Sequence, residues 1–386
     1  MSSELKPKIR FKGFTDDWEQ RKLKEMTLYK NGTGHEDKQS SNGRYELINL
    51  NSVSIDGGLK SSGKFIDDSN ETLKKNDLVM VLSDVGHGDL LGRVALIPTN
   101  NKFVLNQRVA LLRPNGTINP RFLFTCINAG QNYFKMNGAG SSQLNISREV
   151  VEKFEPFVPK KEEQQKISTI FESLDNLITL HQRKCDKLIE LKKSLLEKMF
   201  PQNNSVIPEI RFKGFTDDWE QRKLGDECFE LMAGGDIDKT RSVNNGKYPI
   251  YANALTNEGI VGYYNDSYRV KSPAVTITGR GEIGYAMARN TDFTPVVRLI
   301  SLRSKHNNYF LANAINLLSV VSESTGVPQL TIPQVEKFDI YFPKKINEEI
   351  KLGRLFNEID NLITLYQRKH DKLNKIKQSL LNDMFV

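Results

Sequence analysis

A long identical repeat is the feature of this sequence that most constrains its fold. Residues 9–23 read IRFKGFTDDWEQRKL, and residues 210–224 repeat those fifteen letters without a change. A second pair of segments, 175–188 and 360–373, differs at only two of its fourteen positions. Self-similarity on this scale indicates that one unit has been duplicated. The chain is therefore predicted to consist of two equivalent halves.

The stretches between the repeated segments share only sparse markers, which occur in the same order. NGRY at 42–45 matches NGKY at 245–248, and QLNI at 143–146 matches QLTI at 329–332. Ordered markers at drifting offsets indicate one fold with rewritten loops, and 386 residues are enough for two or three domains. The predicted organisation is a repeated segment (1–23), a first variable domain (24–160), a first long helix (161–200), a linker with the second repeated segment (201–224), a second variable domain (225–345) and a second long helix (346–386).

The segments that follow the variable domains have a helical period. Their apolar residues recur at three- and four-residue spacing, which predicts one helix of about 38 residues, or about 57 Å, in each half. A lone helix cannot bury such a seam, so we expect the two helices to pair as an antiparallel coiled coil with pseudo-two-fold symmetry. The predicted seam residues are Ile167, Ile170, Leu174, Leu177, Leu188, Leu191 and Leu195, and Leu352, Leu355, Ile359, Leu362, Leu373, Ile376 and Leu380.

Polar residues interrupt the middle of both predicted seams. They are His181 and Lys184 in the first helix and Tyr366 and Lys369 in the second. Polar seam residues can set the register of a coiled coil at some cost in stability. The alternative is that the two lysines only extend their ammonium groups into solvent, and the sequence leaves both interpretations open.

The variable domains combine short β-rich runs with loops of Gly, Asn and Asp. Runs such as 78–82 and 274–277 predict strands, and only a few helical pieces are visible, chiefly 121–129 and 309–321. The predicted fold class is α+β, with two similar, mostly-β domains, each followed by a long helix.

Composition removes several classes of protein from consideration. With 38% hydrophobic and 26% charged residues, the chain has the composition of a globular protein rather than a disordered one. The three cysteines are scattered and form no C-x-x-C pair, so no disulfide framework or zinc knuckle is predicted. Neither a signal peptide nor a run of 18 apolar residues is visible. We therefore expect a cytoplasmic protein with reduced thiols and no membrane association.

Catalytic motifs are matched only superficially. Residues 279–284 fit G-x-G-x-x-G, but strand-like residues follow where a dinucleotide site needs a helix, so a tight turn between strands is predicted. Ser83, Asp84 and His87 lie close in sequence without triad geometry, and Gly86 and Gly88 on either side of His87 indicate a turn. The five histidines show no metal-ligand spacing, and there is no Walker-type loop. No catalytic residue, cofactor site or metal site is predicted in this chain.

Basic residues are concentrated in the variable domains. The chain carries 55 Lys and Arg against 47 Asp and Glu, a net charge of +8. Residues 90–148 contain seven basic residues and no acidic one, whereas the long helices are nearly balanced. Such a field suits a polyanion and predicts salt-sensitive DNA binding, although any single residue could simply face solvent. The predicted DNA-binding residues are Lys38, Arg44, Arg93, Lys102, Arg108, Arg113, Arg121, Lys239, Arg241, Arg269, Lys271, Arg280, Arg289 and Arg298.

The whole chain resembles the specificity (S) subunit of type I restriction-modification systems. The resemblance rests on the order of variable domain and long helix, repeated twice, on FKGFTDDWEQRKL at 11–23 and 212–224, on RGEIG at 280–284, and on the two Q-L-x-I segments. One departure is that the first domain has VGHGDLLG at 85–92 where the second has the RGEIG turn.

The resemblance implies a function without chemistry in this chain. Each variable domain would be a target recognition domain that reads one half of a split, asymmetric site in double-stranded DNA. The helices would be spacers, and about 57 Å corresponds to about 17 base pairs. Two copies of a methylation (M) subunit would dock on the repeated faces, and restriction (R) subunits would join them. S-adenosylmethionine, ATP and magnesium would belong to those partners.

Two other functions compete with this interpretation. A free-standing sequence-specific DNA-binding protein would need no partner, but the repeated amphipathic helices resemble surfaces that dock protein. A nuclease or methyltransferase in its own right is opposed by the missing catalytic motifs. The DNA half-sites and the individual base-contacting residues are not predictable from one sequence, because readout depends on loop geometry and DNA deformation.

Overall fold

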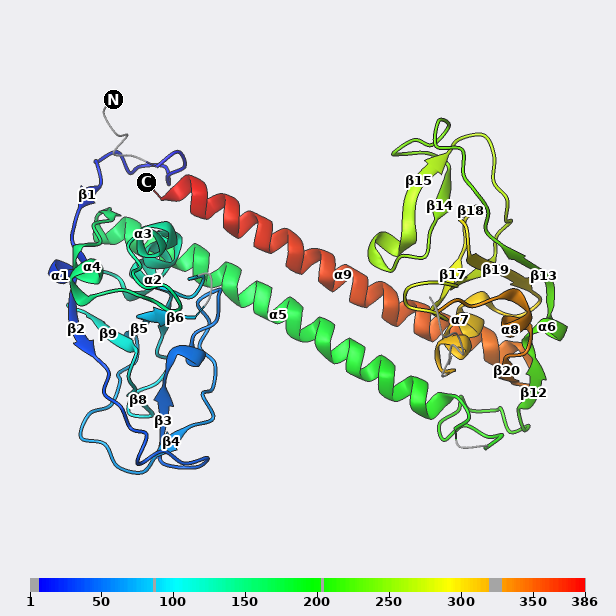
Figure 1. Cartoon of the computed structure of the whole chain (residues 1–386), viewed down its shortest axis with the longest axis horizontal. Coiled ribbons are helices and arrows are strands. Elements are labelled where there is room, and N and C mark those ends of the chain that lie inside the picture. The colour runs from blue at the N-terminus through cyan, green and yellow to red at the C-terminus, as the bar shows by residue number, and fades with distance from the viewer. Residues whose placement is uncertain (1–6, 86–87, 203–204, 319–327, 386) are drawn as a thin grey trace. The chain divides into compact units, whose positions relative to one another are not determined.

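The computed structural model describes residues 7–85, 88–202, 205–318 and 328–385. The chain forms two compact units, Met1–Leu180 with Lys369–Val386, and His181–Arg368. Each unit contains one β-rich domain and one end of each of two long helices (Figure 1). The compact units therefore cut across the segments that are continuous in sequence.

The domain of the first unit is built on a four-stranded antiparallel sheet of order β2-β9-β5-β7. All four side chains of the central strand β5 are buried, and they alternate between two clusters. Leu78 and Met80 belong to the cluster that includes the helix α2 (Pro120–Ala129), whereas Val79 and Val81 face the opposite way. The strands are β2 (Thr27–Asn31), β9 (Val109–Pro114), β5 (Leu78–Val81) and β7 (Val94–Leu96).

A three-stranded sheet packs against the second face of this domain's larger sheet. Its order is β4-β3-β8, and β3 and β8 run parallel. Ile48 and Leu105 from this sheet share a cluster with Val79 and Val81. The domain thus has three layers, with helix on one side of the central sheet and a second sheet on the other. The remaining elements of this domain are β1 (Glu19–Gln20), α1 (Leu23–Met26), β3 (Tyr45–Ile48), η1 (Leu50–Ser52), β4 (Phe65–Ile66), β6 (Ser83–Asp84), β8 (Phe103–Leu105), α2 (Pro120–Ala129), α3 (Gln131–Met136), β10 (Leu144–Asn145), α4 (Arg148–Lys153) and β11 (Phe157–Val158).

The domain of the second unit repeats this topology. Its sheets have the orders β13-β19-β16-β17 and β15-β14-β18, and β14 and β18 again form the parallel pair. The predicted duplication is therefore confirmed at the level of strand order. The helix expected at 309–321 begins at Asn308 and ends at Asn316, and 319–321 lie outside the described residues. The elements are β12 (Glu220–Lys223), α6 (Leu224–Glu227), β13 (Cys228–Ala233), β14 (Tyr248–Tyr251), η2 (Thr256–Gly259), β15 (Ile260–Tyr264), β16 (Ala274–Thr278), β17 (Ala286–Arg289), β18 (Thr294–Pro295), β19 (Leu299–Ser304), α7 (Asn308–Asn316), α8 (Ile332–Glu336) and β20 (Asp339–Phe342).

Two helices of 39 residues each follow the domains, α5 (Lys161–Met199) and α9 (Ile346–Met384). In the first unit, Asp175 of α5 contacts Lys377 of α9. In the second unit, Lys192 contacts Asp360 and the Cys185 thiol contacts Gln367. Residue numbers rise along one helix while they fall along the other, so the helices pack antiparallel within each unit. The predicted fold class, two β-rich domains each followed by a long packed helix, is confirmed.

The apolar seam of these helices differs from the predicted one. Leu177, Leu191, Leu362 and Ile376 were expected in the seam, but all four side chains are exposed. The buried and half-buried positions that face inward follow an unbroken spacing of three and four residues, and several of them are polar. A seam assigned from apolar residues alone therefore has the wrong frame. The observed seams are Phe171, Leu174, Ile178, His181, Cys185, Leu188, Lys192, Leu195 and Met199 in α5, and Phe356, Ile359, Ile363, Tyr366, His370, Leu373, Lys377, Leu380 and Met384 in α9.

The polar residues at the centre of the predicted seams include residues that lie in the observed seam and a lysine that lies at its edge. His181 and Tyr366 pack against each other in the second unit, with ring centroids 5.6 Å apart. Lys184 is exposed, and its ammonium lies 5.2 Å from the centre of the Tyr366 ring. His181 and Tyr366 are therefore seam residues, whereas Lys184 extends along the edge of the seam.

No helix within the described ranges is long and apolar enough to cross a membrane.

Four aromatic rings fasten each domain to the helix pair. In the first unit, Phe385 after α9 lies 6.3 Å from Trp18, 5.7 Å from Phe122 and 5.9 Å from Phe171, measured between ring centroids. In the second unit, Phe200 after α5 makes the same contacts with three other rings, at 5.4–5.9 Å. In each unit the rings come from the repeated segment, the domain helix, one long helix and the residue that follows the other long helix, so the repeat encodes a joint as well as a seam. The partners of Phe200 are Trp219, Phe310 and Phe356.

A buried ion pair lies at the start of each long helix. Arg10 contacts Glu163 through two nitrogens, at 2.9 and 2.7 Å, and Arg211 contacts Glu348 at 2.8 and 2.7 Å. Hydrogen bonding to Glu163 raises the pKa of the Arg10 guanidinium, although burial opposes it. Both pairs tie the repeated segment to a helix, and both carboxylates are almost completely buried.

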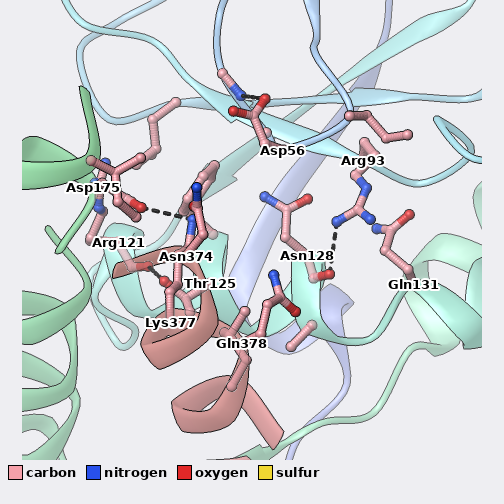
Figure 2. Close-up of a pocket in the computed structure, with 18 of the residues that line it drawn as sticks. Asp56, Arg93, Arg121, Thr125, Asn128, Gln131, Asp175, Asn374, Lys377 and Gln378 are labelled. Atoms are coloured by element: carbon pink, nitrogen blue, oxygen red, sulfur yellow. Dashed lines mark hydrogen bonds and ion pairs between the residues drawn. The ribbon is translucent and has the colours of Figure 1, made fainter. Parts of the chain in front are cut away.

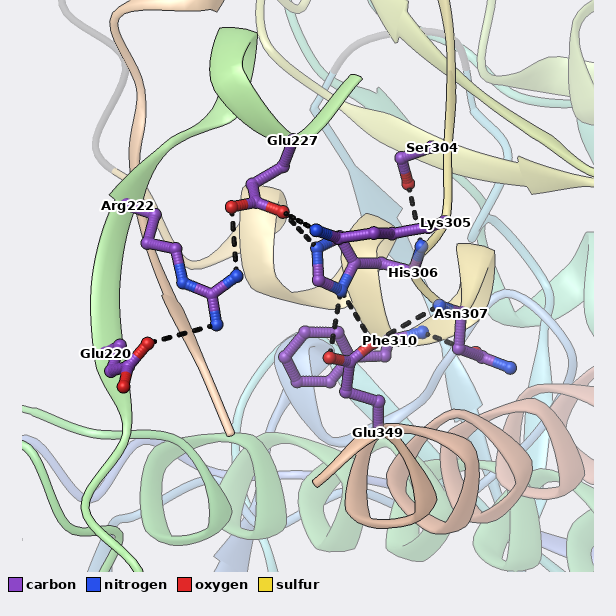
Figure 3. A network of polar contacts seen from close by, with 9 residues as sticks. All are labelled: Glu220, Arg222, Glu227, Ser304, Lys305, His306, Asn307, Phe310 and Glu349. Carbon is purple, nitrogen blue, oxygen red and sulfur yellow. Dashed lines mark hydrogen bonds and ion pairs between the residues drawn. The ribbon is translucent and has the colours of Figure 1, made fainter. Parts of the chain in front are cut away.

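The second unit adds an ionic network at this joint (Figure 3). His306 lies between two carboxylates, with Nε2 2.8 Å from Glu227 and Nδ1 2.9 Å from Glu349. Burial lowers the pKa of His306, but the two carboxylates outweigh burial and raise it. Burial acts in the opposite sense on Glu227, whose pKa nevertheless falls to about 2 because His306, Arg222 and Lys305 all contact it. The network connects α6, the loop before α7 and the first turn of α9.

Candidate nucleic-acid interface

The predicted DNA-binding residues divide into exposed, half-buried and buried groups. The exposed ones lie in loops, where they can reach a ligand, whereas the half-buried ones contact the protein itself. Arg93, Arg113, Arg121 and Arg298 are half-buried, and Arg289 is buried. The exposed residues are Lys38, Arg44, Lys102, Arg108, Lys239, Arg241, Arg269, Lys271 and Arg280.

Equivalent loops in the two domains carry exposed basic residues. Lys38 and Arg44 lie between β2 and β3, and Lys239 and Arg241 lie between β13 and β14. Lys38 and Lys239 also occupy the same position relative to the repeat. The Arg44 guanidinium lies 5.1 Å from the centre of the Tyr45 ring, and Arg241 forms an ion pair with an exposed carboxylate. These loops present positive charge to solvent in both domains.

Three further exposed residues precede strands. Lys102 comes before β8, whereas Arg269 and Lys271 come between β15 and β16. Arg269 donates a hydrogen bond of 2.5 Å to the backbone oxygen of Asp236, which fixes its direction. These side chains extend the basic surface beyond the two long loops.

Arg113 and Arg121 are engaged in ion pairs inside the first unit. Arg113 contacts Asp77 through two nitrogens at 2.8 and 2.7 Å, and this hydrogen bonding raises the pKa of its guanidinium. Arg121 contacts Asp175 at 2.8 Å. In both cases the charge is neutralised by a partner distant in sequence, so these residues support the fold.

Arg121 and Arg93 line a cavity of about 700 Å³ between the first domain and the helix ends of the same unit (Figure 2). Arg93 donates a hydrogen bond of 3.0 Å to the backbone oxygen of Asn128, and burial lowers the pKa of its guanidinium. Asp175 binds Lys377 at 2.7 Å as well as Arg121, so one carboxylate bridges α2 and α9. Arg121 therefore contacts the helix pair, whereas Arg93 contacts α2 (Figure 2).

Arg289 is enclosed by the second domain. Only 4% of it is exposed, and its guanidinium lies 3.6 Å from the centre of the Tyr251 ring. It donates hydrogen bonds of 3.0 Å to the Thr276 hydroxyl and to the backbone oxygen of Glu258, and burial lowers its pKa. A guanidinium held in this way is not available to a ligand at the surface.

A shallow depression of about 320 Å³ surrounds Arg108 in the first domain. Asn31, Ser83 and Asn145 line it from three different elements. The Ser83 hydroxyl donates a hydrogen bond of 2.7 Å to Asn145, and Gln143 donates one to the same hydroxyl. Ser83 and Asp84 thus belong to a strand pair with β10, whereas His87, the third residue of the apparent triad, lies outside the described residues.

The corresponding surface of the second domain keeps the arginine and the glutamine, as Arg298 and Gln329, but has Ala233 and Thr331 in place of Asn31 and Asn145. Arg298 donates a hydrogen bond of 2.6 Å to the amide oxygen of Gln329, and Arg280 is exposed on the turn between β16 and β17. This turn confirms that the G-x-G-x-x-G match at 279–284 joins two antiparallel strands. It also locates the counterpart loop of the first domain, since β5 and β7 are joined by residues 82–93.

Several polar residues of these surfaces were not singled out from the sequence. Asn31, Asn145 and Gln329 carry amides that donate and accept hydrogen bonds, as base-edge recognition requires. Asn145 belongs to the first Q-L-x-I segment, and Gln329 begins the second. The repeated Q-L-x-I markers were therefore the sequence signal that could have identified Asn145 and Gln329.

Among the described residues, no group of three or more His, Cys, Asp and Glu side chains could hold a metal ion.

Comparisons with known proteins agree with this architecture. The type I restriction modification DNA specificity domain matches the chain twice, at residues 15–190 and 216–375. The type I restriction enzyme MjaVIII specificity subunit of Methanocaldococcus jannaschii is 21% identical, and the match covers 83% of this chain and 81% of that protein. The crystal structure of a type I restriction-modification S subunit from M. genitalium has the same fold, with a TM-score of 0.76 and 16% identity over 99% of both chains.

The two family matches together span most of the chain, and each contains one β-rich domain. The chain belongs to the family of type I restriction-modification DNA specificity proteins. Within a type I restriction enzyme, it is a non-catalytic specificity subunit with two recognition domains.

Proposed function

We propose that each β-rich domain reads one half of a split, asymmetric DNA site. The observation that carries this proposal is that two domains of the same topology present different polar side chains at equivalent surfaces. Asn31 and Asn145 line the depression beside Arg108 in the first domain, whereas Ala233 and Thr331 occupy the corresponding positions in the second. Two domains that share a fold but differ in their surface side chains favour two different half-sites.

The charges around these surfaces fit double-stranded DNA. Residues 90–148 carry no acidic side chain, and exposed basic loops such as the one with Lys38 recur in both domains. Lysine and arginine in loops neutralise phosphates, whereas amides and guanidinium groups read base edges in the major groove. The loops thus supply affinity, and the side chains around Arg108 and Arg298 supply specificity.

We further propose that the repeated helix faces dock two copies of a methylation subunit. Leu177 and Ile376 are exposed in the first unit, and Leu191 and Leu362 are exposed in the second. Leu177 corresponds to Leu362, and Leu191 to Ile376, so both units present the same exposed apolar pair. Apolar side chains left in solvent at duplicated positions favour two copies of one partner. Restriction subunits would join this core, and S-adenosylmethionine, ATP and magnesium would bind to the partners.

A base-resolution map of DNA methylation tests the recognition proposal. Cells that carry this gene and its methylation partner should show one split motif methylated on both strands, and cells that lack only this gene should lose it. Replacement of residues 24–160 by the corresponding domain of a related protein should change one half of the motif. An unchanged map, together with tight specific DNA binding by the purified chain alone, would instead favour a free-standing DNA-binding protein.

Paired substitutions on the helices test the docking proposal. Leu177→Ser with Ile376→Ser should remove one copy of the methylation subunit from the purified complex, and Leu191→Ser with Leu362→Ser should remove the other. Native mass spectrometry counts the copies directly. Ile189→Ser is the matched control, because Ile189 is equally exposed but its counterpart in the repeat is Asn374. Retention of both copies by both double variants would contradict the proposed docking face.

A further inference from the structure

Arg108 and Arg298 share an unusual backbone conformation. Their φ angles are 65° and 70°, in the left-handed region that residues other than glycine and asparagine rarely adopt. Each immediately precedes an equivalent strand, β9 or β19. The two domains therefore keep an arginine at the same conformationally costly position, although the residues before it differ, Gln107 in one and Val297 in the other.

A close backbone crossing holds each arginine turn in place. A Cβ atom on Gly32 would lie 1.7 Å from the backbone oxygen of Asn106, and one on Gly234 would lie 2.0 Å from that of Val296. Both glycines also donate hydrogen bonds to the strand that follows the arginine, at 3.0 and 2.7 Å. The neighbouring glycine segment thus holds the turn in its left-handed conformation, and this backbone conformation sets the direction in which the arginine side chain leaves the chain.

The arginines adjoin amide side chains in both domains. Arg108 is exposed beside Asn31, Ser83 and Asn145 in the depression of the first domain. The Arg298 guanidinium donates through Nη1 to Gln329, a residue of the second Q-L-x-I segment. Backbone that is costly for an arginine, kept at two diverged surfaces lined by hydrogen-bonding groups, is typical of a functional position.

We propose that Arg108 and Arg298 each read a guanine edge in the DNA half-site of their own domain. The guanidinium fork pairs with O6 and N7 of guanine in the major groove, which is the commonest specific arginine contact with DNA. The exposed lysines of the β2–β3 and β13–β14 loops, on flexible stems, would contact phosphates instead. This inference rests on the proposed function and names one specificity-determining residue for each half-site.

Arg108→Gly and Arg298→Gly test the inference in the full chain with its methylation partner in cells. Arg108→Gly should relax one guanine position in one half-site and leave the other half unchanged, and Arg298→Gly should do the reverse. Discrimination against the wrong base should fall about 5- to 150-fold at the relaxed position. Arg108→Lys should also relax it, because lysine keeps the charge but not the fork.

The same variants separate this role from a structural one. Glycine relieves the left-handed conformation, so the thermal midpoint of each glycine variant should stay constant or rise. Asn76→Gly is the matched control, since Asn76 also has left-handed backbone, with φ of 70°, at an exposed turn, and its methylation map should equal that of the parent.

Three outcomes would overturn the inference, and they are distinguishable. Glycine variants that keep the parent motif would leave the proposed function standing without these arginines. A uniform fall in methylation with no relaxed base would assign the arginines to phosphates. A parent chain that directs no motif at all would remove the proposed function, and this inference with it.

Discussion

The joint between domain and long helix uses the same ion pair in both units, but different neighbours surround it. In the second unit, Glu349 follows the paired carboxylate, accepts a hydrogen bond from the cap residue of α7, and contacts His306. In the first unit, Gln164 occupies that position and accepts the equivalent bond from the cap residue of α2 at 2.8 Å. The backbone arrangement is thus preserved while the charge is not.

The exchange extends to the other buried members of the network, whereas the half-buried Arg222 keeps its counterpart, Arg21, in the identical repeat. Glu227 and His306 in the second unit correspond to Met26 and to the buried Ile118 in the first. A buried charge without its partners is strongly destabilising, so the ionic set could change to the neutral set only as a whole. The comparison teaches that the repeat keeps the geometry of the joint, whereas the side chains around it vary as coupled groups.

Removal of the shared ion pair should lower the free energy of unfolding more than any other change, and by the same amount in both units. Glu163→Ala and Glu348→Ala each leave a guanidinium buried without its carboxylate, which should cost about 3 to 5 kcal/mol of unfolding free energy. The chain has two tryptophans, Trp18 and Trp219, one buried in each unit. Changing either one to phenylalanine leaves a fluorescence reporter for the other unit during denaturant unfolding.

Exposed neighbours of the two glutamates provide controls. Glu162→Ala and Asn347→Ala remove side chains that precede the buried ones by one residue and are exposed. These variants should stay within about 0.5 kcal/mol of the parent. A loss confined to one unit would show that the two joints are not equivalent.

A methyl group added at the arginine turns should lower the free energy of unfolding by less than loss of the ion pair does, and again by the same amount in both units. Gly32→Ala and Gly234→Ala place a methyl group against backbone, which cannot move aside, so each should cost about 1 to 3 kcal/mol. Gly34→Ala and Gly235→Ala are matched controls, because their nearest obstacles are the flexible ends of Glu36 and Arg269. Denaturation midpoints of the four variants test this, and equal losses at test and control positions would contradict the close crossing.

The ionic network should give the second joint a fall of stability at alkaline pH that the corresponding contacts of the first joint do not supply. Because the pKa of His306 is raised in the fold, its contribution is complete below about pH 6.5 and is lost as the pH rises through the folded value. Because the pKa of Glu227 is lowered to about 2, its contribution is complete above about pH 4.5 and is lost as the pH falls toward 2. Although burial opposes it, contact with Glu227 raises the pKa of the Arg222 guanidinium, so Arg222 stays charged throughout both ranges.

Unfolding followed by Trp219 fluorescence across these pH ranges measures the effect. His306→Gln should abolish the fall of stability above pH 6.5, because glutamine keeps a hydrogen-bonding group but does not titrate there. The first unit, with Met26, Ile118 and Gln164 at its joint, supplies no such fall from the corresponding contacts. An alkaline fall that persists in His306→Gln would assign it to other groups.

The sequence predicted the fold because its evidence was redundant. Two identical segments, ordered markers such as QLNI at 143–146, and long helical periods all indicated the same duplicated plan. The seam frame was wrong for a local reason: Lys192 and Cys185 occupy inward positions, whereas Leu177 and Leu191 are exposed. Hydrophobic spacing identifies a helix well, but adjacent frames differ by one residue and are easily confused.

The candidate site was less predictable. Arg113 and Arg289 counted as basic surface in the sequence, yet Asp77 neutralises the first and Tyr251 covers the second. Those partners lie 36 and 38 positions away, so no local pattern announces them. The left-handed backbone at Arg108 is likewise invisible in sequence, because such turns are expected to carry glycine or asparagine. Charge density in the sequence indicated which domains carry the basic residues, but only the tertiary contacts show which of these residues are exposed.

The smallest expected difference between the units lies in the seam. Asp175 binds both Arg121 and Lys377, whereas the one ion-pair partner of its counterpart Asp360 among the described residues is Lys192. All these side chains are partly solvated, so single pairs contribute little. Asp175→Asn should cost about 1 kcal/mol and Asp360→Asn about half as much, measured by denaturant unfolding of each unit. Arg121→Gln should reduce the first effect to the size of the second, because Arg121 is the additional contact. If Asp175→Asn remained as costly in the Arg121→Gln background, the difference between the two seams would have another origin.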